Sequence, residues 1–193
     1  MENRDKIWKS IPEEIKRILP ETYKTLNPPV DVKDIEALEK QLGVRLPLAF
    51  KSYLNVFNGQ TGQGEDFPLA GYNRFLPVKE IITLIRQQIE MFGDEEPVGF
   101  ITENKVKPVL WDNLWVPFAD FNSSARLILD LDAGKNGQDG QVILLYPGTD
   151  MESDDMVVAS SFDDFGKELL RRLKNNEFKI EDDTIIFKDN WII

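Results

Sequence analysis

The spacing of apolar residues changes character near residue 109, and this change constrains the fold more than any other feature. Before that point apolar residues recur at helical spacing, as at Ile81, Ile85 and Ile89. Beyond it, short apolar runs typical of strands stand at 109–111, 115–118, 125–130, 141–146 and 156–159. The connections of roughly three to ten residues between them suit hairpins and are too short for helical crossovers. The chain is therefore predicted to be α+β, with N-terminal helices followed by an antiparallel, or mixed, sheet of about five to six strands and helices packed on it.

Capping signals mark where the predicted helices begin. Ser10-Ile11-Pro12-Glu13 is typical of a capping box with proline at the first helical position, so the first helix is predicted to begin there and to end at Pro20. Glycine at Gly43 is typical of a helix end. Further helices are predicted to begin at Asp31, Pro47, Pro77 and Ser161. The stretches 60–66 and 93–107 show neither period and are expected to be flexible or surface loops.

The length of 193 residues suits one domain with a substantial core. We predict a single domain over 1–193, with its core at about 8–174 and a hairpin-like C-terminal extension at 175–193. No apolar run approaches the ~18 residues that cross a bilayer, and the N-terminus lacks the apolar stretch of a secretory signal. We therefore expect a cytoplasmic protein that does not insert into membranes.

The sequence contains neither histidine nor cysteine. The chain thus lacks the usual general base near neutral pH, the commonest ligand of transition metals, and any thiolate nucleophile or zinc ligand. Serine–histidine hydrolases, cysteine–histidine proteases and His-liganded zinc enzymes are excluded on this ground. We predict no catalytic residues, no metal and no cofactor; any catalysis would have to use carboxylates, lysine or tyrosine.

The charge balance is strongly acidic. Lys and Arg number 23 against 34 Asp and Glu, which gives a net charge of −11. Such a field repels the phosphates of nucleic acids and anionic lipid surfaces, so direct nucleic-acid binding is not expected. The same field would speed the encounter with a basic protein partner, although acidity also serves solubility alone.

The stretch DLDAGKNGQDGQVILLY, residues 130–146, places aspartates and glycines in one loop ahead of a strand. It does not fit a calcium loop, because its fifth, sixth and twelfth positions hold Gly, Lys and Gln, and it lacks the phosphate-loop pattern. Two interpretations remain open. Asp130 and Asp132, with Asp139, could form a carboxylate site for metal-assisted hydrolysis. Alternatively, the loop is a hairpin connection whose aspartates accept bonds from backbone amides and whose glycines supply unusual backbone angles.

Two tryptophans, Trp111 and Trp115, adjoin the predicted strands. They could stack on a sugar or on a lysine, which would suit a carbohydrate-binding module. Aromatic residues beside strands are more typical of half-buried core, and both interpretations stay open.

Three segments resemble one known family. The first is DIEALEKQLGVRLPLAFKSYLNVFNGQ, residues 34–60, in which Leu38, Glu39, Leu42, Gly43, Leu46, Pro47, Asn58 and Gly59 fill the pattern of the SUKH superfamily. The second, WVPFADFNSSARLILDLDAGKNGQDGQVILL, and the third, VVASSFDDF, resemble its Smi/Knr-like branch, named for fungal regulators of cell-wall assembly and killer-toxin resistance. The chain departs from the pattern at 122–124 and at Ala133, where many members have other residues.

The resemblance implies a non-catalytic α+β interaction module. Bacterial members act mainly as immunity proteins that bind and neutralise toxins, and the fungal namesake coordinates cell-wall synthesis with signalling. A compact single domain favours the bacterial role, so a basic toxin domain is the expected partner. A cell-wall or signalling regulator is the alternative.

The predicted partner-binding surface combines the loop after residue 130 with the end of the third predicted helix. It comprises Trp115, Asp130, Asp132, Gly137, Asp139, Gly140 and Gln141, with Asn58, Gly59 and Gln60 expected close by. Asp130 and Gln141 are also expected to anchor the loop, in which case their role is architectural.

Overall fold

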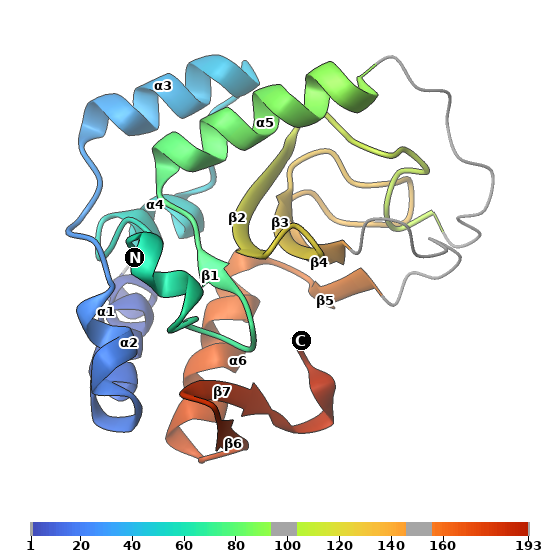
Figure 1. Cartoon of the computed structure of the whole chain (residues 1–193). Helices are drawn as coiled ribbons and strands as arrows, with labels where there is room; N and C mark the ends of the chain where they lie inside the picture. Colours follow the sequence, from blue (N-terminus) through green and yellow to red (C-terminus); the bar gives the residue numbers. More distant parts are fainter. Residues whose placement is uncertain (1, 94–103, 146–155, 193) are drawn as a thin grey trace.

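The computed structural model describes residues 2–93, 104–145 and 156–192 (Figure 1). Its centre is a five-stranded antiparallel sheet in which the strands follow one another in sequence order. A separate two-stranded hairpin lies near the C-terminus. The strands of the sheet are β1 (Arg74–Phe75), β2 (Trp115–Phe121), β3 (Ala125–Asp130), β4 (Gln141–Leu145) and β5 (Val157–Ala159), and those of the hairpin are β6 (Phe178–Glu181) and β7 (Thr184–Phe187).

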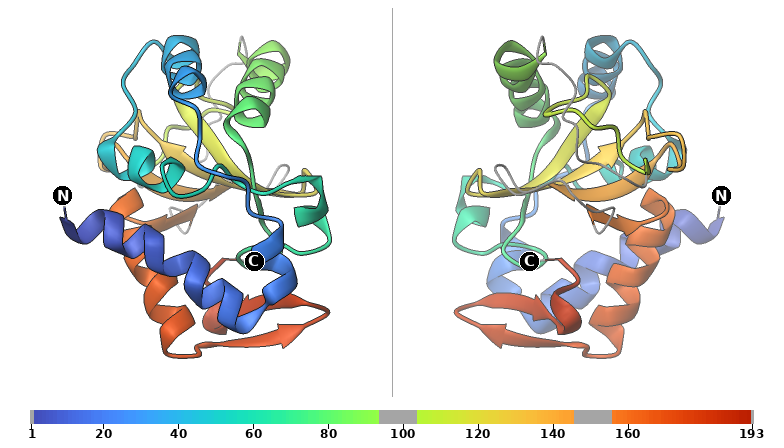
Figure 2. Two further views of the ribbon diagram at one scale, coloured as in Figure 1. Left: turned by 90° about the vertical axis from the view of Figure 1, so that its left-hand side faces the viewer. Right: turned by 90° about the vertical axis from the view of Figure 1, so that its right-hand side faces the viewer.

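Helices cover both faces of the sheet. Figure 2 shows α3 and α5 on one side of it, and α1, α6 and the hairpin on the other. The helices are α1 (Glu2–Ile18), α2 (Pro20–Lys24), α3 (Val32–Leu42), α4 (Leu48–Leu54), α5 (Val78–Phe92) and α6 (Phe162–Lys174), with short 3-10 turns η1 (Gly62–Glu65) and η3 (Lys188–Asn190). Among the described residues, no helix combines the length and the apolar character that crossing a bilayer requires.

The core on the α6 side of the sheet is largely aromatic. Phe118 of β2 contacts the rings of Phe162 and Phe165 on α6. Trp8 of α1 stacks on Phe162 with ring centroids 5.0 Å apart, and it is fully buried. Glycine at Gly166 leaves room for the indole of Trp8, because a Cβ at this position would lie 2.9 Å from the indole. These rings bury large apolar areas and join α1 to the sheet through α6.

The α+β class, the helices before the sheet and the C-terminal hairpin are confirmed. The predicted boundaries of α3 and the predicted start of α6 are confirmed. Asp31 accepts a hydrogen bond from the Lys33 amide at the start of α3, and Gly43 ends that helix with a φ of 74°. The Ser161 hydroxyl caps α6. The run 125–130 is β3.

Other expectations were wrong. The first helix begins at Glu2, not at Ser10, whose hydroxyl donates to the Lys6 carbonyl inside the helix. The buried stripe of Trp8, Ile11 and Ile15 extends the helix upstream past the apparent capping box. The run 109–111 is not a strand, and the two-residue β1 was not predicted. Gln60, expected in a flexible loop, is fully buried. Tyr146 and most of the expected loop 93–107 lie outside the described residues.

Candidate functional site

The segment between β3 and β4, residues 131–140, is here called the glycine loop. Its base is closed by the in-register pair Asp130 and Gln141, whose backbones face each other across the two strands. The Gln141 side-chain amide donates to Asp130 Oδ2 at 2.8 Å and to the Lys105 carbonyl at 2.9 Å. Asp130 Oδ1 accepts from the Asp132 backbone amide at 3.1 Å. Both oxygens of this carboxylate are therefore occupied by groups of the chain itself.

Asp130 is fully buried. Burial raises the pKa of its carboxyl, while the bonds from Gln141 and the Asp132 amide, and a smaller effect of the Trp115 indole, act in the opposite direction. A raised carboxyl pKa is also common at catalytic sites. Here it accompanies a side chain that contacts no solvent and serves as the acceptor that holds the loop.

The glycines of the loop allow a second segment of backbone to approach closely. The Gly134 amide donates to the Lys105 carbonyl at 3.0 Å, and the Asn136 amide donates to the Asn104 carbonyl at 2.9 Å. A Cβ at Gly134 would lie 2.2 Å from the Asn104 carbonyl oxygen, and one at Gly137 would lie 2.0 Å from that of Lys105. Any side chain at these two positions would collide with backbone, so the spacing of the glycines reflects the packing of residues 104–105 against the loop.

The exposed aspartates of the glycine loop are engaged as well. Asp132 forms an ion pair with Lys107, whose ammonium also lies 3.2 Å from Asp112. Burial lowers the pKa of Lys107, but the two carboxylates outweigh it and the net shift is upward. Asp139 accepts a bond from the Ala133 amide at 3.0 Å. Within the described ranges, no three acidic side chains converge as metal ligands would. The pairing of β3 with β4, and the bonds of Asp130 and Asp139 to backbone amides, give the loop the structure of a hairpin connection.

Trp111 and Trp115 lie in the core beside the glycine loop. Their side chains are 4% and 0% exposed, and their rings meet edge to face with centroids 5.7 Å apart. Trp115 is paired in register with Asp130 at the start of β2. Neither ring offers a face on which a sugar could stack.

The segment 58–60, here called the NGQ turn, joins α4 to β1 and α5. Asn58 Oδ1 accepts from the Val78 amide at 2.9 Å, at the first residue of α5. The buried Gln60 side chain accepts from the Phe75 amide and donates to the Thr25 hydroxyl and the Phe67 carbonyl. These bonds satisfy polar groups of four segments, so the NGQ turn stabilises the junction between them.

The glycine loop and the NGQ turn were expected to lie close together, but they approach β2 at different points along its length. Trp115 pairs with Asp130 at one end, whereas Ala119 pairs with Phe75, whose carbonyl accepts from the Gln60 amide. Four residues of strand separate these points, which is roughly 13 Å. Of the predicted contact residues, Trp115, Asp130, Gln141, Gly59 and Gln60 are buried; the loop positions Asp132, Gly137, Asp139 and Gly140 and the Asn58 side chain reach solvent at least in part.

Comparison with known protein families gives a match over most of the chain. The model of the SMI1 / KNR4 family (SUKH-1) matches residues 29–168, most of the chain. The chain belongs to the SMI1/KNR4 family. A search of curated proteins finds no match. The matched range begins just before α3, ends within α6 and includes both the NGQ turn and the glycine loop, whereas α1, α2 and the hairpin lie outside it.

This member of the SMI1/KNR4 family has a crevice that the sequence analysis missed, here called the α5 crevice. It lies between α5 and the β2–β3 turn, has a volume of about 240 Å³, and its polar lining comprises Arg74, Glu80, Thr83, Gln87, Asp120 and Ser123. Leu76 and Leu84 supply its apolar part. The sequence feature that could have indicated this crevice is charge inside strands, because Asp120 and Arg126 interrupt runs that are otherwise apolar.

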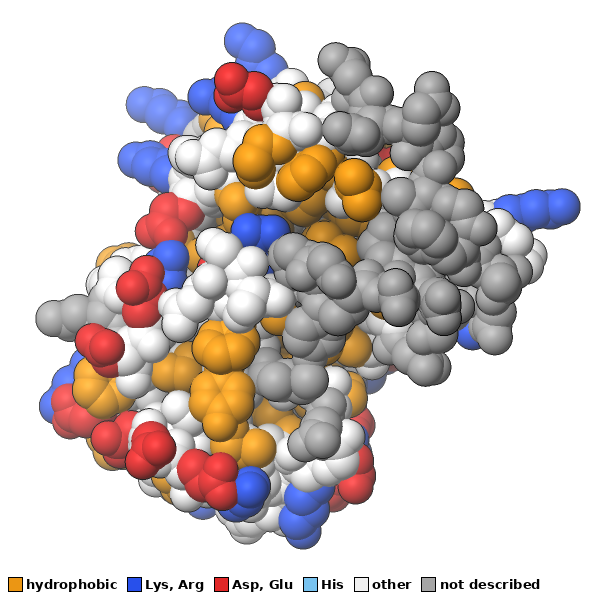
Figure 3. Space-filling view, turned by 45° about the vertical axis from the view of Figure 1, so that its right-hand side comes forward, with side chains coloured by type: hydrophobic (Ala, Val, Ile, Leu, Met, Phe, Trp, Pro, Cys, Tyr) orange, Lys and Arg blue, Asp and Glu red, His pale blue; other side chains and the backbone are white. Residues whose placement is uncertain are grey.

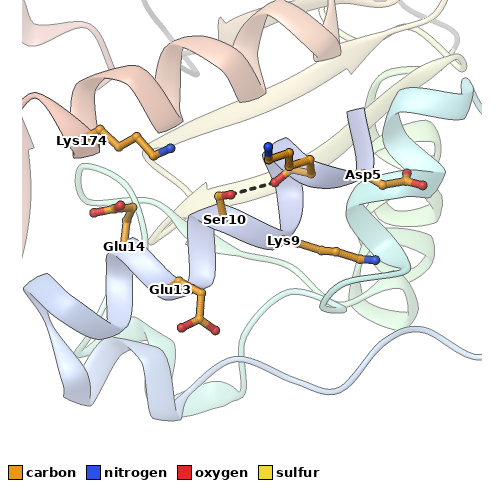
Figure 4. A pocket seen from close by; sticks show the side chains of 7 residues that line it. Asp5, Lys9, Ser10, Glu13, Glu14 and Lys174 are labelled. Carbon is orange, nitrogen blue, oxygen red and sulfur yellow. Dashed lines mark hydrogen bonds between the residues drawn. The ribbon is translucent and has the colours of Figure 1, made fainter. Parts of the chain in front are cut away.

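A second hollow lies at α1 and the end of α6 (Figure 4). Three acidic and three basic side chains line it, so its net charge is zero, and Asp5, Lys9 and Glu13 are exposed. In Figure 4 the dashed bond within α1 joins Ser10 to the Lys6 carbonyl, and the charged side chains diverge from one another. This hollow has no buried polar group and no preference for a ligand of either charge.

Proposed function

We propose that this member of the SMI1/KNR4 family is a non-catalytic protein-binding module, and that it acts as an immunity protein by binding and neutralising a basic toxin. Members of the family bind partner proteins, and the family includes both immunity proteins and regulators of cell-wall assembly. The observation that carries the proposal is that the carboxylates of Asp130 and Asp132 are bound by other groups of the chain itself. Asp130 is held by Gln141 and the Asp132 amide, and Asp132 by Lys107, which supports a structural role for this pair over acid–base chemistry.

Charge supports a basic protein partner. The net charge of −11 would accelerate association with a cationic domain and disfavour contact with nucleic acid, so the module would bind the toxin and not the toxin's substrate. An immunity protein needs no catalysis, because occupying the active surface of the toxin is sufficient.

The test is binding and protection with the toxin encoded by the adjacent gene. The purified chain is mixed with that toxin's basic domain, and complex formation is followed by size-exclusion chromatography and calorimetry at two ionic strengths. We expect a stoichiometric complex whose association rate falls as salt rises, together with survival of cells that co-express the two proteins. Absence of both complex and protection would refute the immunity role and favour the cell-wall regulator, which the same family match allows.

A further inference from the structure

The β6–β7 hairpin turns part of its backbone outward, away from its own ladder. The Lys188 amide donates to the Glu177 carbonyl at 3.1 Å, so these two residues form a hydrogen-bonded pair across the hairpin. Along an antiparallel ladder such pairs alternate with pairs whose backbone groups point outward. Ile180 pairs with Ile185 three steps further along, so the N–H and C=O groups of these two residues lie on the outer edges of the hairpin.

The outer edge of β7 is occupied, whereas that of β6 is open. The Ile185 carbonyl accepts from the Gly71 amide at 3.0 Å, as the outward direction of its backbone requires. Among the described residues, none bonds to the backbone of Ile180 on the opposite edge. Figure 2 shows the hairpin at the lower end of the molecule. An open strand edge of this kind is a template for pairing with a strand of another chain.

The side chains of β6 place an apolar residue between two opposite charges. Ile180 is 49% exposed. Lys179 and Glu181 are 63% and 49% exposed and form an ion pair with each other at 2.7 Å. At the lower end of the molecule in Figure 3, acidic and basic side chains lie next to one another. The edge therefore offers a short pattern of charges in place of a broad apolar surface.

This pattern is complementary to itself. When two copies of β6 run antiparallel about a two-fold axis at Ile180, each Lys179 lies opposite the Glu181 of the other copy. The two Ile180 residues then face each other as a hydrogen-bonded pair, because their backbone groups point outward. A register centred on Lys179 would instead place two lysines directly opposite each other, which is destabilising. The charges thus favour the register centred on Ile180.

The ion pair within β6 does not prevent this pairing. Exposed pairs contribute little to stability, and an ammonium has three donors, so Lys179 can contact the carboxylates of both copies. A lysine on an edge strand ordinarily protects it against a second copy, since like charges would meet. Glu181 removes this protection, because it supplies the opposite charge at the position that Lys179 faces.

We propose that β6 is a self-association edge, through which two copies of this chain join their hairpins into one four-stranded antiparallel sheet. Two backbone hydrogen bonds between the Ile180 residues, the contact of their side chains and the two Lys179–Glu181 pairs hold it together. A four-residue strand buries less than the about 1,200 Å² of a stable interface, so the dimer is weak and depends on concentration. The inference does not rest on the proposed function, because the hairpin lies outside the family match over 29–168.

The direct test is the mass of the full chain in solution as its concentration rises. Sedimentation equilibrium is measured from roughly 10 µM to 1 mM, a range that suits weak association. We expect a monomer–dimer equilibrium, and backbone amide shifts by NMR over the same range that centre on residues 178–182. A monomer at every concentration, or shifts that centre on another surface, would overturn the proposal.

Charge reversal tests the register. Lys179→Glu and Glu181→Lys each place like charges opposite each other at two points, so each should weaken self-association about tenfold or more. Mixed in equal amounts, the two variants should associate with each other about as strongly as the parent chain does with itself, because one presents two acidic side chains and the other two basic ones. Lys33→Glu, at an exposed position of α3, is the matched control and should leave the equilibrium unchanged.

Ile180→Lys tests the position of the two-fold axis. This variant keeps the backbone N–H but brings two ammonium groups together at the axis, so the dimer should be lost. Far-UV circular dichroism and a dispersed amide spectrum show that each variant is folded. Dimers of unchanged strength in folded Ile180→Lys, or a mixture of the two charge variants that stays monomeric, would overturn the proposal.

Discussion

The fold depends on a glycine whose replacement by alanine should be costly for two separable reasons. Gly59 in the NGQ turn has a φ of 61°, and a Cβ there would lie 2.4 to 2.5 Å from the Leu76 carbonyl group and the Pro77 nitrogen. These are backbone atoms at the junction of β1 and α5, so they cannot rotate away. Gly43 at the end of α3 has a similar φ of 74°, but a Cβ there would meet nothing within 4 Å.

The two positions allow strain and collision to be measured apart. A left-handed backbone costs a non-glycine residue about 1–2 kcal/mol, so Gly43→Ala should lower the free energy of unfolding by that amount. Gly59→Ala carries the same cost together with overpacking of about 1–3 kcal/mol, for a total of about 2–5 kcal/mol. In a chain of this length each kcal/mol lowers the melting temperature by about 2–4 °C.

Urea unfolding followed by far-UV circular dichroism measures both variants on one scale. Equal losses for Gly59→Ala and Gly43→Ala would show that the NGQ turn relaxes to admit a methyl group. The claim that this turn fixes the approach of α4 to the β1–α5 junction would then be refuted.

Three further results follow from side chains that are buried or partly buried. Burial raises the pKa of Glu39, but bonds from Lys51, Leu46 and Arg45 outweigh burial and lower this pKa to about 2, so the ionised side chain stabilises the fold above its ordinary pKa of 4.5. This stabilisation is lost as the pH falls from 4.5 towards 2. In acid titrations of unfolding, the parent chain should therefore lose about 3 kcal/mol more stability over this range than Glu39→Gln. Asp130→Ala should lower the free energy of unfolding in urea by about 1–3 kcal/mol, because the buried donors that bind Asp130 lose their acceptor. Asp139→Ala, at an exposed position, should change this free energy little. Equal effects of the two substitutions would contradict the anchoring role of Asp130. Trp191→Ala should lower the melting temperature because Trp191 stacks on α6 with centroids 5.5 Å from Phe165, and an unchanged value would show that the hairpin is not coupled to the core.

Elements fixed by neighbouring residues could be predicted from the sequence, and those fixed by distant ones could not. The boundaries of α3 follow from Asp31 and Gly43, which act within one helical turn. The start of α1 does not follow from its own capping signal, because Trp8 is buried against α6, more than 150 residues away in sequence. Residues 109–111 have the composition of a strand, yet they lie outside the sheet, whose strands in the described part of the chain are β1 to β5.

The same distinction applies to the candidate site. The hairpin interpretation of the glycine loop depended on Asx-type bonds and glycine backbone angles, which are local. The bonds of Asp130 and Asp139 agree with it, but the expected backbone angles occur only at Gly140, whose φ is 89°, and not at Gly134 or Gly137. The collision that requires glycine at Gly134 and Gly137 involves residues 104–105 and could not be read from the loop. The α5 crevice joins Arg74, Glu80 and Asp120 from three elements, one of them only two residues long, so no period or spacing could indicate it.

The residues that carry the family resemblance are also the ones that hold the fold together. Glu39 ties the end of α3 to the Leu46 amide and to Lys51 on α4. Gly59 allows the backbone between β1 and α5 to approach, and Asp130 with Gln141 closes the glycine loop. Each is buried and directs its bonds inward. Such residues can be shared by proteins with unrelated partners, because they specify a scaffold and present nothing to a binding surface. Partner choice must then depend on exposed positions outside this set, where a substitution can change recognition at little cost in stability.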